Sequence, residues 1–192
     1  MEGIMFSKYT YLLIFLMSFA IWGVSCTDTT LTDHYIDSKH RAILQKSESQ
    51  LDKKNHDITS ELLMEVKKKT ARYHSTTQAI QNGYVEDTHC VSNPDKGGMG
   101  YHWLNEGLVD PVFDPLNPEA LIYERDKNGN PKLIAVEYIV IDVGQPHPHF
   151  GDQPFDIGGT PVPVDHYSLH VWIYKDNPSG TFEPYNPNVS CD

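Results

Sequence analysis

The sequence predicts an α+β fold, in which N-terminal helices pack on a mostly antiparallel β-sheet held by one disulfide. Two observations lead to this prediction. Helical patterning is confined to the part of the chain before Gly83, whereas strand patterning dominates after Tyr84. In addition, Asn128-Gly129 separates two strand-like runs and favours a tight reversal between them. Residues 58–192 are predicted to form a single α+β domain, which is long enough to bury a hydrophobic core.

Residues 1–25 are predicted to be a lipoprotein-type signal peptide. Lys8 precedes an apolar run from Tyr9 to Val24, which is shorter than the roughly 20 residues of a membrane-spanning helix. The run ends in Gly23-Val-Ser-Cys26, where small residues precede a cysteine as in a lipoprotein cleavage box, although Gly23 stands where Leu is usual. We therefore expect export, lipidation of Cys26, and anchoring on the periplasmic or outer face of the cell envelope. Plain secretory cleavage and an uncleaved anchor are the alternatives.

The predicted helical region comes after this leader. Residues 26–57 are polar and are expected to form a tether with a weak helix over 38–51. A clearer helix is expected to begin near Thr59 or Ser60, whose hydroxyl suits an N-cap. Another is expected from Ser75 to Asn82, and Gly83 is expected to end it because glycine readily adopts the left-handed conformation that succeeds a helix.

The strand region begins with a short strand predicted over 85–91 and a second over 100–104. A hairpin comes next, with strands over 120–125 and 132–142. Residues 143–164 are rich in proline and glycine and are predicted to be a long surface loop, a kind of segment that is often functional. The last strand, over 165–174, alternates so that His166, Ser168 and His170 share one side.

The cysteine count agrees with export. The chain has three cysteines, and if Cys26 carries lipid, Cys90 and Cys191 remain as an even pair. An oxidising compartment favours a disulfide between them. Two separate buried thiols are the alternative.

The charge of the chain excludes one class of partner. The net charge is −11, and 17 acidic against five basic residues lie from Gly83 to Asp192. Such a surface repels phosphate backbones, so we expect no nucleic-acid partner. It attracts cations and keeps the protein soluble.

His102, Glu137 and His170 are predicted to form a transition-metal site. Glu137 lies in a strand with two apolar faces, so its carboxylate needs a buried partner. Two histidines and one carboxylate with open positions are ligands of non-haem iron and catalytic zinc, and copper is the third candidate. The alternatives are a hydrogen-bonded structural Glu137, a general base or an exposed edge residue, and histidines that only pack and bond to backbone.

Four further histidines are candidates for additional metal contacts: His74, His147, His149 and His166. His74 equally suits the dipole of a helix C-terminus. His147 and His149 lie in the long loop, where they are either ligands, part of a lid, or simply solvated. Residues i and i+4 of a strand are roughly 13 Å apart, so His166 and His170 cannot share one metal unless the strand is bulged.

Spaced motifs give a resemblance over the region from Thr70 to Cys191. In chain order the motifs are Thr70-Ala-Arg-Tyr, Asn82-Gly-Tyr84, Gly98-Met-Gly-Tyr-His102, Val136-Glu-Tyr138, Leu169-His-Val-Trp172 and Cys191. Together they resemble a group of uncharacterised exported bacterial proteins and lipoproteins. The resemblance implies a single exported domain with a two-cysteine frame, and it implies no activity.

The leading functional hypothesis is a cell-envelope metal-binding lipoprotein. One alternative is a metal-dependent hydrolase or oxidoreductase on the same three residues, and another is a non-catalytic module that binds a glycan or peptide. The sequence contains no Gly-x-Ser-x-Gly elbow, no His-Glu-x-x-His helix and no Cys-x-x-Cys pair, so it favours no particular enzyme class. The sequence alone leaves open whether the chain is an enzyme and which protein or small molecule it meets.

Overall fold

The computed structural model describes residues 30–159 and 162–191, and the chain divides into two compact units, residues 1–45 and 46–192. All strands of the described residues lie in the second unit. The predicted signal peptide and Cys26, the predicted site of lipidation, fall outside the described residues. Among the helices in the described ranges, none combines the length and apolar character needed to cross a membrane.

Helix α1 spans Thr30–Thr70, so the prediction that a helix begins at Thr59 or Ser60 is wrong. No proline or glycine interrupts this stretch, and about half of its residues are good helix formers, so nothing in the sequence breaks the helix before Thr59. Thr59 has another role. The Thr59 hydroxyl donates to the Asp152 carboxylate at 2.6 Å, and the Asp152 N–H donates to the hydroxyl oxygen of Thr59 at 3.2 Å. The contact ties α1 to the segment predicted to be a loop.

The next helices are short: η1, Ala71–His74, and α2, Thr76–Gln81. The predicted end of the second helix at Gly83 is confirmed. Gly83 has a φ of 92°, and its N–H donates to the Ile80 carbonyl at 3.0 Å. The Tyr84 N–H donates to the Ala79 carbonyl at 3.1 Å, which completes a Schellman motif. This turn directs the chain from the helices into the sheet.

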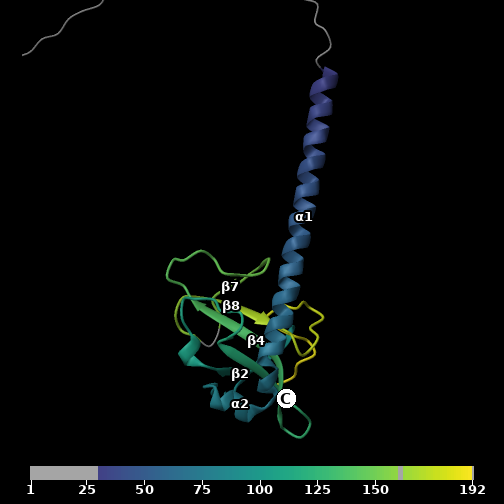
Figure 1. Ribbon diagram of the computed structural model, residues 1–192. Coiled ribbons are helices and arrows are strands. Elements are labelled where there is room, and N and C mark those ends of the chain that lie inside the picture. Colours follow the sequence, from purple (N-terminus) through teal and green to yellow (C-terminus); the bar gives the residue numbers. More distant parts are fainter. Residues whose placement is uncertain (1–29, 160–161, 192) are drawn as a thin grey trace, which may run out of the picture. The chain divides into compact units, whose positions relative to one another are not determined.

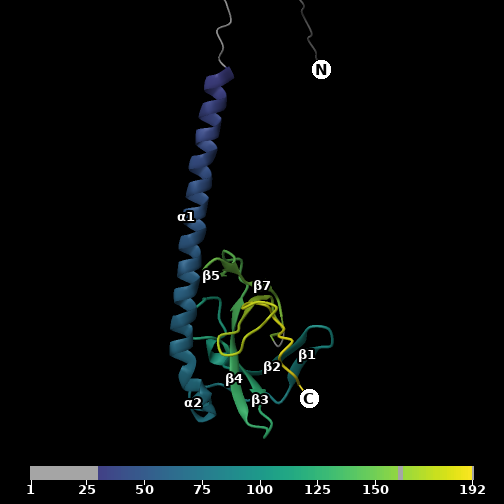
Figure 2. The same cartoon turned by 90° about the vertical axis from the view of Figure 1, so that its right-hand side faces the viewer.

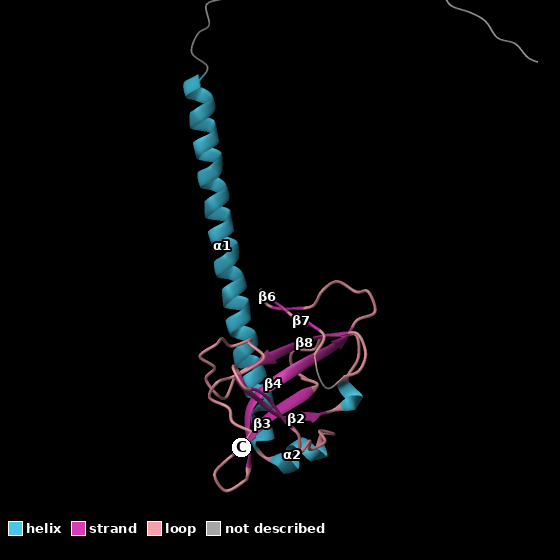
Figure 3. Ribbon diagram, turned by 180° about the vertical axis from the view of Figure 1, so that it is seen from behind, coloured by secondary structure: helices cyan, strands magenta, loops and turns pink. Residues whose placement is uncertain are grey.

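The fold is α+β, as predicted, with a six-stranded antiparallel sheet in the order β1-β2-β3-β4-β8-β7 (Figures 1 and 3). Its strands are β1 Cys90–Asn93, β2 Gly97–Leu104, β3 Ala120–Arg125, β4 Pro131–Ile141, β7 Asp156–Ile157 and β8 His166–Val171. A 3-10 turn, η2, Glu106–Leu108, lies between β2 and β3. A separate two-stranded sheet pairs β5, His149–Phe150, with β6, Gln153–Pro154.

Two parts of the strand region differ from the prediction. The first strand begins at Cys90 instead of ending there, and Val85 forms only an isolated bridge with Leu104. The segment 143–164 is not a bare surface loop, because it contains β5, β6 and β7. Phe150 and Phe155 of this segment are buried, and their burial draws the segment onto the domain. The predicted β3–β4 hairpin is confirmed.

The two faces of the sheet have different covers. Val136 and Tyr138 of β4 belong to the main hydrophobic core, together with Val66 of α1 and Tyr73 of η1. Because successive strand residues point to opposite faces, Glu137 lies on the other face. Figure 2 shows β4 between the last turns of α1 and the yellow C-terminal segment. Both faces of β4 are therefore buried, as predicted.

The C-terminal segment, residues 172–191, covers the second face. The Gly98 N–H of β2 donates to the carbonyls of Val189 and Asn186, at 3.0 and 3.2 Å. The Tyr174 N–H donates to the Ile134 carbonyl of β4 at 3.1 Å. The predicted disulfide between Cys90 and Cys191 is present and joins the end of this segment to β1. The segment is thus held against the sheet at several points.

Removing the disulfide is expected to destabilise the domain strongly. The bridge closes a loop with a sequence separation of 101 residues, for which the chain-entropy model gives about 4–5 kcal/mol, and measured bridges often deliver less. Chemical unfolding of Cys90→Ser/Cys191→Ser should therefore show a free energy of unfolding lower by about 2–5 kcal/mol. A reducing agent should lower the stability of the wild type and leave the variant unchanged. Equal stabilities of the two proteins would contradict this role.

Gly97→Ala is expected to loosen the C-terminal segment. A Cβ at Gly97 would overlap the backbone of Asn186 and Pro187, whereas a Cβ at Gly129 meets nothing within 4 Å. Both glycines have positive φ, 94° and 81°, so Gly129→Ala controls for backbone strain alone. We expect a loss of more than about 2 kcal/mol for Gly97→Ala and about 1 kcal/mol for Gly129→Ala, measured by chemical unfolding. Equal losses would show that the contact with the segment is unimportant.

Candidate metal centre

Three strands bring the candidate ligands together on the covered face of the sheet. Glu137 on β4 and His170 on β8 are directly opposite in register. His102 lies on β2, and β3 separates β2 from β4, so these two strands are about 10 Å apart. The register partner of Glu137 on β3 is Ala120, a small and fully buried residue. Its short side chain leaves space in which His102 and Glu137 meet above β3.

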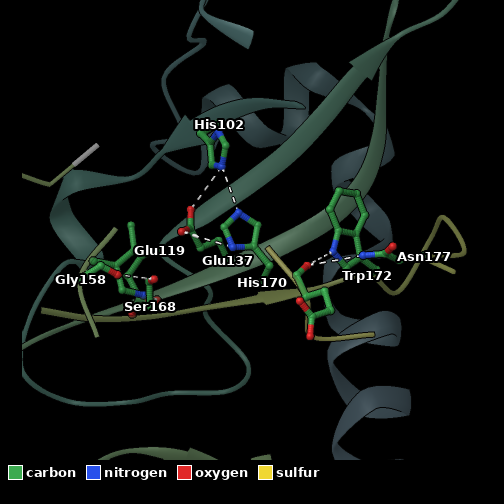
Figure 4. A network of polar contacts seen from close by, with 10 residues as sticks. His102, Glu119, Glu137, Gly158, Ser168, His170, Trp172 and Asn177 are labelled. Carbon is green, nitrogen blue, oxygen red and sulfur yellow. Dashed lines mark hydrogen bonds and ion pairs between the residues drawn. The ribbon is translucent and has the colours of Figure 1, made fainter. Parts of the chain in front are cut away.

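The three side chains converge at their polar ends (Figure 4). The two Nε2 atoms of His102 and His170 are 3.3 Å apart. His102 Nε2 lies 3.6 Å from Glu137 Oε2, and His170 Nδ1 lies 3.7 Å from Glu137 Oε1. One ligand atom from each residue can be chosen so that all three lie within 4.8 Å of one another. The sequence-predicted trio is therefore a compact cluster.

This cluster is buried and incompletely paired. Glu137 is 1% exposed, His102 3% and His170 4%. Oxygen Oε2 of Glu137 is buried and has no hydrogen-bond partner within residues 30–159 and 162–191. Within the described part of the chain, no lysine or arginine forms an ion pair with Glu137. An unpartnered buried carboxyl oxygen costs free energy, so a cation at the centre of the cluster would stabilise it.

Burial determines the charge of the cluster in the absence of a metal. It raises the pKa of Glu137 well above the usual value, and the charge of Glu119 adds to this. It lowers the pKa of His102 to about 4, although the charge of Asp87 and a hydrogen bond to the Gly100 backbone oppose the shift. Burial, and after it the neighbouring His102, lowers the pKa of His170 well below its usual value. The contacts among the three residues therefore join neutral groups near neutral pH.

The geometry of the two rings suits a shared metal ion. Two imidazole nitrogens bound at about 2.0–2.1 Å to one tetrahedral ion are ~3.3 Å apart. The separation of 3.3 Å between the Nε2 atoms of His102 and His170 matches this value. Neutral imidazole is also the form that binds metals. The cluster is thus able to hold a transition-metal ion with two nitrogen ligands and one oxygen ligand.

The other candidate histidines lie outside this cluster. His74 is exposed and stacks edge-on with Tyr174. His147 Nε2 is 2.7 Å from the Phe155 carbonyl, and His149 is exposed. These side chains are engaged elsewhere or solvated.

His166 is the fourth of these histidines, and it is buried on β8. Its Nδ1 lies 2.6 Å from the Val164 carbonyl, and its Nε2 has no partner. It is absent from the metal-compatible group found among the described residues, which contains only His102, Glu137 and His170. Strand β8 pairs with β4 without a register shift, so no bulge brings His166 and His170 together.

A cavity of about 530 Å³ reaches the cluster from the side of Glu137 and His170. Its walls include Met99 of β2, Asp156 of β7 and Glu183 of the C-terminal segment. A second cavity, of about 680 Å³, reaches His102. Sequence reasoning missed Ala120 and Glu183. Alternation marks Ala120 only as a strand residue, and nothing local signals that Glu183 lines a cavity.

Comparison with known proteins adds no assignment. No family model, no curated protein and no solved structure matches this chain. The resemblance to exported bacterial proteins stays a prediction. The geometry of the His102, Glu137 and His170 cluster is therefore the basis for a functional assignment.

In the metal-free protein, Glu137→Gln is expected to change how stability depends on pH. A carboxyl whose pKa is raised by folding contributes its full stability below its ordinary value of 4.5, and the contribution is lost as pH rises through the folded-state pKa. Between about pH 5 and about pH 8, the wild type should lose stability relative to the variant, by up to about 1.4 kcal/mol per pH unit. The histidine contributions are common to both proteins and cancel in the difference.

Urea unfolding at both pH values measures this effect. Glu61→Gln, which changes an exposed carboxyl on α1, is the control and should shift stability equally at both pH values. A wild-type protein that keeps a constant stability difference from Glu137→Gln would show that Glu137 ionises normally.

Proposed function

We propose that the protein is an exported, lipid-anchored metal-binding protein whose ligands are His102, Glu137 and His170. One observation carries this proposal. A fully buried carboxyl group faces two buried neutral imidazoles, and its oxygen Oε2 has no hydrogen-bond partner among the described residues. A divalent cation at this point would displace the proton of the Glu137 carboxyl and accept one lone pair from each of the three side chains.

A neighbouring carboxylate shows what a purely structural glutamate looks like in this fold. Glu119 is also 1% exposed, but its Oε2 accepts a hydrogen bond from the Ile139 N–H at 2.9 Å. Glu137 has no comparable donor for its Oε2. The contrast favours a ligand role for Glu137 over a structural hydrogen-bonding role.

The ligand set narrows the choice of metal. Two imidazoles and one carboxylate suit zinc, iron or copper, whereas calcium and magnesium prefer sites built from oxygen alone. Three protein ligands leave at least one coordination position open on these ions. The cavity that reaches Glu137 and His170 provides space for a further ligand at that position.

That cavity favours a second candidate function on the same site, a metal-dependent hydrolase or oxidoreductase. A closed structural metal site has no need of an adjacent cavity of about 530 Å³. An open position beside a cavity is the arrangement in which a bound metal activates water or a substrate. Metal binding is the common requirement of both functions, so it is tested first.

The cellular location in this proposal rests on the N-terminal sequence and the disulfide. Small residues precede Cys26, as at a lipoprotein cleavage site. The disulfide between Cys90 and Cys191 is of the kind that forms and persists in exported proteins. Both features agree with a domain held at the outer or periplasmic face of a membrane by lipid on Cys26.

Metal analysis of the purified protein tests the proposal. Prepared without chelator or affinity tag, the wild type should contain or take up about one equivalent of zinc, iron or copper, because three ligands converge on one point. His102→Ala and His170→Ala should each lose this metal. His166→Ala is the matched control, because it removes a buried histidine of the same strand that is absent from the cluster, and it should retain the metal.

The same samples provide a second measurement. Metal that binds only the folded protein raises its thermal stability, so added metal should increase the melting temperature of the wild type and of His166→Ala only. A folded wild type that takes up none of the three metals would refute the proposal. Ligand screening for a glycan- or peptide-binding module would then be the next step.

A further inference from the structure

The cavity beside the metal cluster has an acidic mouth. Asp156 of β7 and Glu183 of the C-terminal segment both line it and both are exposed. Both carboxylates line the same cavity, and partial burial, and after it the charge of Glu183, raises the pKa of Asp156. In the described part of the chain, neither carboxylate forms an ion pair. Asp156 and Glu183 therefore face the cavity, and neither has an ion-pair partner among the described residues.

One basic residue, Lys96, also lines the cavity, and within the described residues it forms no ion pair with these carboxylates. Its ammonium lies over the ring of Tyr185, 6.0 Å from the centroid. The cavity is thus lined by two exposed carboxylates without an ion pair in the described part of the chain and by the buried side chain of Glu137, whose Oε2 has no hydrogen-bond partner there. The exposed pair Asp156 and Glu183 and the buried Glu137 are two separate features of this cavity.

The strand register places the mouth and the cluster at a definite separation. Asp156 is the register partner of Ser168 on β8. Cross-strand partners share a face, and Ser168 and His170 share a face because they are two residues apart, about 7 Å along the strand. The Ser168 hydroxyl donates to the Gly158 carbonyl at 2.7 Å, and both residues line the cavity (Figure 4). A small molecule of about this length can span from the acidic mouth to His170.

We propose that this cavity binds a small molecule carrying an ammonium group, which Asp156 and Glu183 hold while its other end occupies the open coordination position of the metal. The inference rests on the proposed function, because the inner end of the ligand binds the metal at Glu137 and His170. The same two carboxylates weaken the binding of anionic molecules. Asp156 and Glu183 are then specificity-determining residues of the site.

The test uses three probes that share one metal-binding donor and differ only in the charge of a tail. They are 1-(3-aminopropyl)imidazole, 1-propylimidazole and 3-(imidazol-1-yl)propanoate. The tail is on the ring nitrogen opposite the donor, so it cannot chelate the metal. Each probe is titrated into protein loaded with Co²⁺, whose visible absorption reports a change of ligand. The proteins are the wild type, Asp156→Asn/Glu183→Gln, and Glu61→Gln/Glu65→Gln, which makes the same charge change on α1 away from this cavity.

The wild type should bind the ammonium probe roughly tenfold more tightly than the neutral probe, and the carboxylate probe more weakly again. In Asp156→Asn/Glu183→Gln this order should shrink to about twofold, with affinity for the neutral probe unchanged. The α1 control should keep the wild-type order. High salt should reduce the preference, because the mouth is exposed.

The outcomes separate this inference from the proposed function. A cobalt band that appears on loading and does not respond to any probe would support the metal site and refute an open position toward the cavity. Probe binding with the same charge order in both double variants would refute the role of Asp156 and Glu183. If the wild type develops no cobalt band at all, the metal site itself fails, and this inference fails with it.

Discussion

A glutamate buried in the middle of the sheet is the constraint on which the rest of the site depends. Glu137 lies on β4, which has neighbouring strands on both sides and two buried faces, and no hydrogen-bond donor among the described residues reaches its Oε2. Burying such a group is unfavourable unless the surroundings compensate. The compensating groups are the two histidines, brought over by β2 and β8, and Ala120 is small enough to let them meet. We interpret this arrangement as a ligand set prepared for a cation.

The two covers of the sheet have different physical characters. On the α1 side the sheet is covered by a continuous hydrophobic core, which stabilises the domain without chemistry. On the site side it is covered by the C-terminal segment, which is held by backbone hydrogen bonds at Gly98 and Ile134 and by the disulfide at Cys191. Discrete attachments of this kind leave a cavity between them, whereas close packing of apolar side chains fills space. The ligands therefore lie on rigid strands, and the cavity walls come from the segments around them.

Electrostatics links the buried cluster to its surroundings. Without a metal, the raised pKa of Glu137 and the lowered pKa values of both histidines make the cluster neutral. On the proposed function, a divalent metal displaces the Glu137 proton, so metal affinity and pH are coupled. The strongly acidic composition after Gly83 has a local counterpart at the cavity mouth, where Asp156 and Glu183 are unpaired. A charge excess that favours solubility over the whole surface can thus also select ligands at one site.

Local pattern determined much of this protein. Alternation in β8 assigned His170 to a face, and Asn128-Gly129 determined the β3–β4 hairpin. The two apolar faces of β4 indicated a central strand with a buried carboxylate, and cysteine parity predicted the disulfide. These features depend on neighbours in the chain, so the sequence by itself contains them.

The tertiary structure decided what depends on distant neighbours. The start of α1 could not be located from the hydroxyl of Thr59, because that hydroxyl contacts Asp152, which is 93 positions away. The strands within 143–164 form because Phe150 and Phe155 are buried in the shared core. Strand order and register decided that His102 meets His170, that Glu137 Oε2 has no partner, and that Asp156 faces the same cavity. A period-2 pattern specifies the face of each side chain, but only packing across the whole domain determines which strands lie side by side and what their side chains meet.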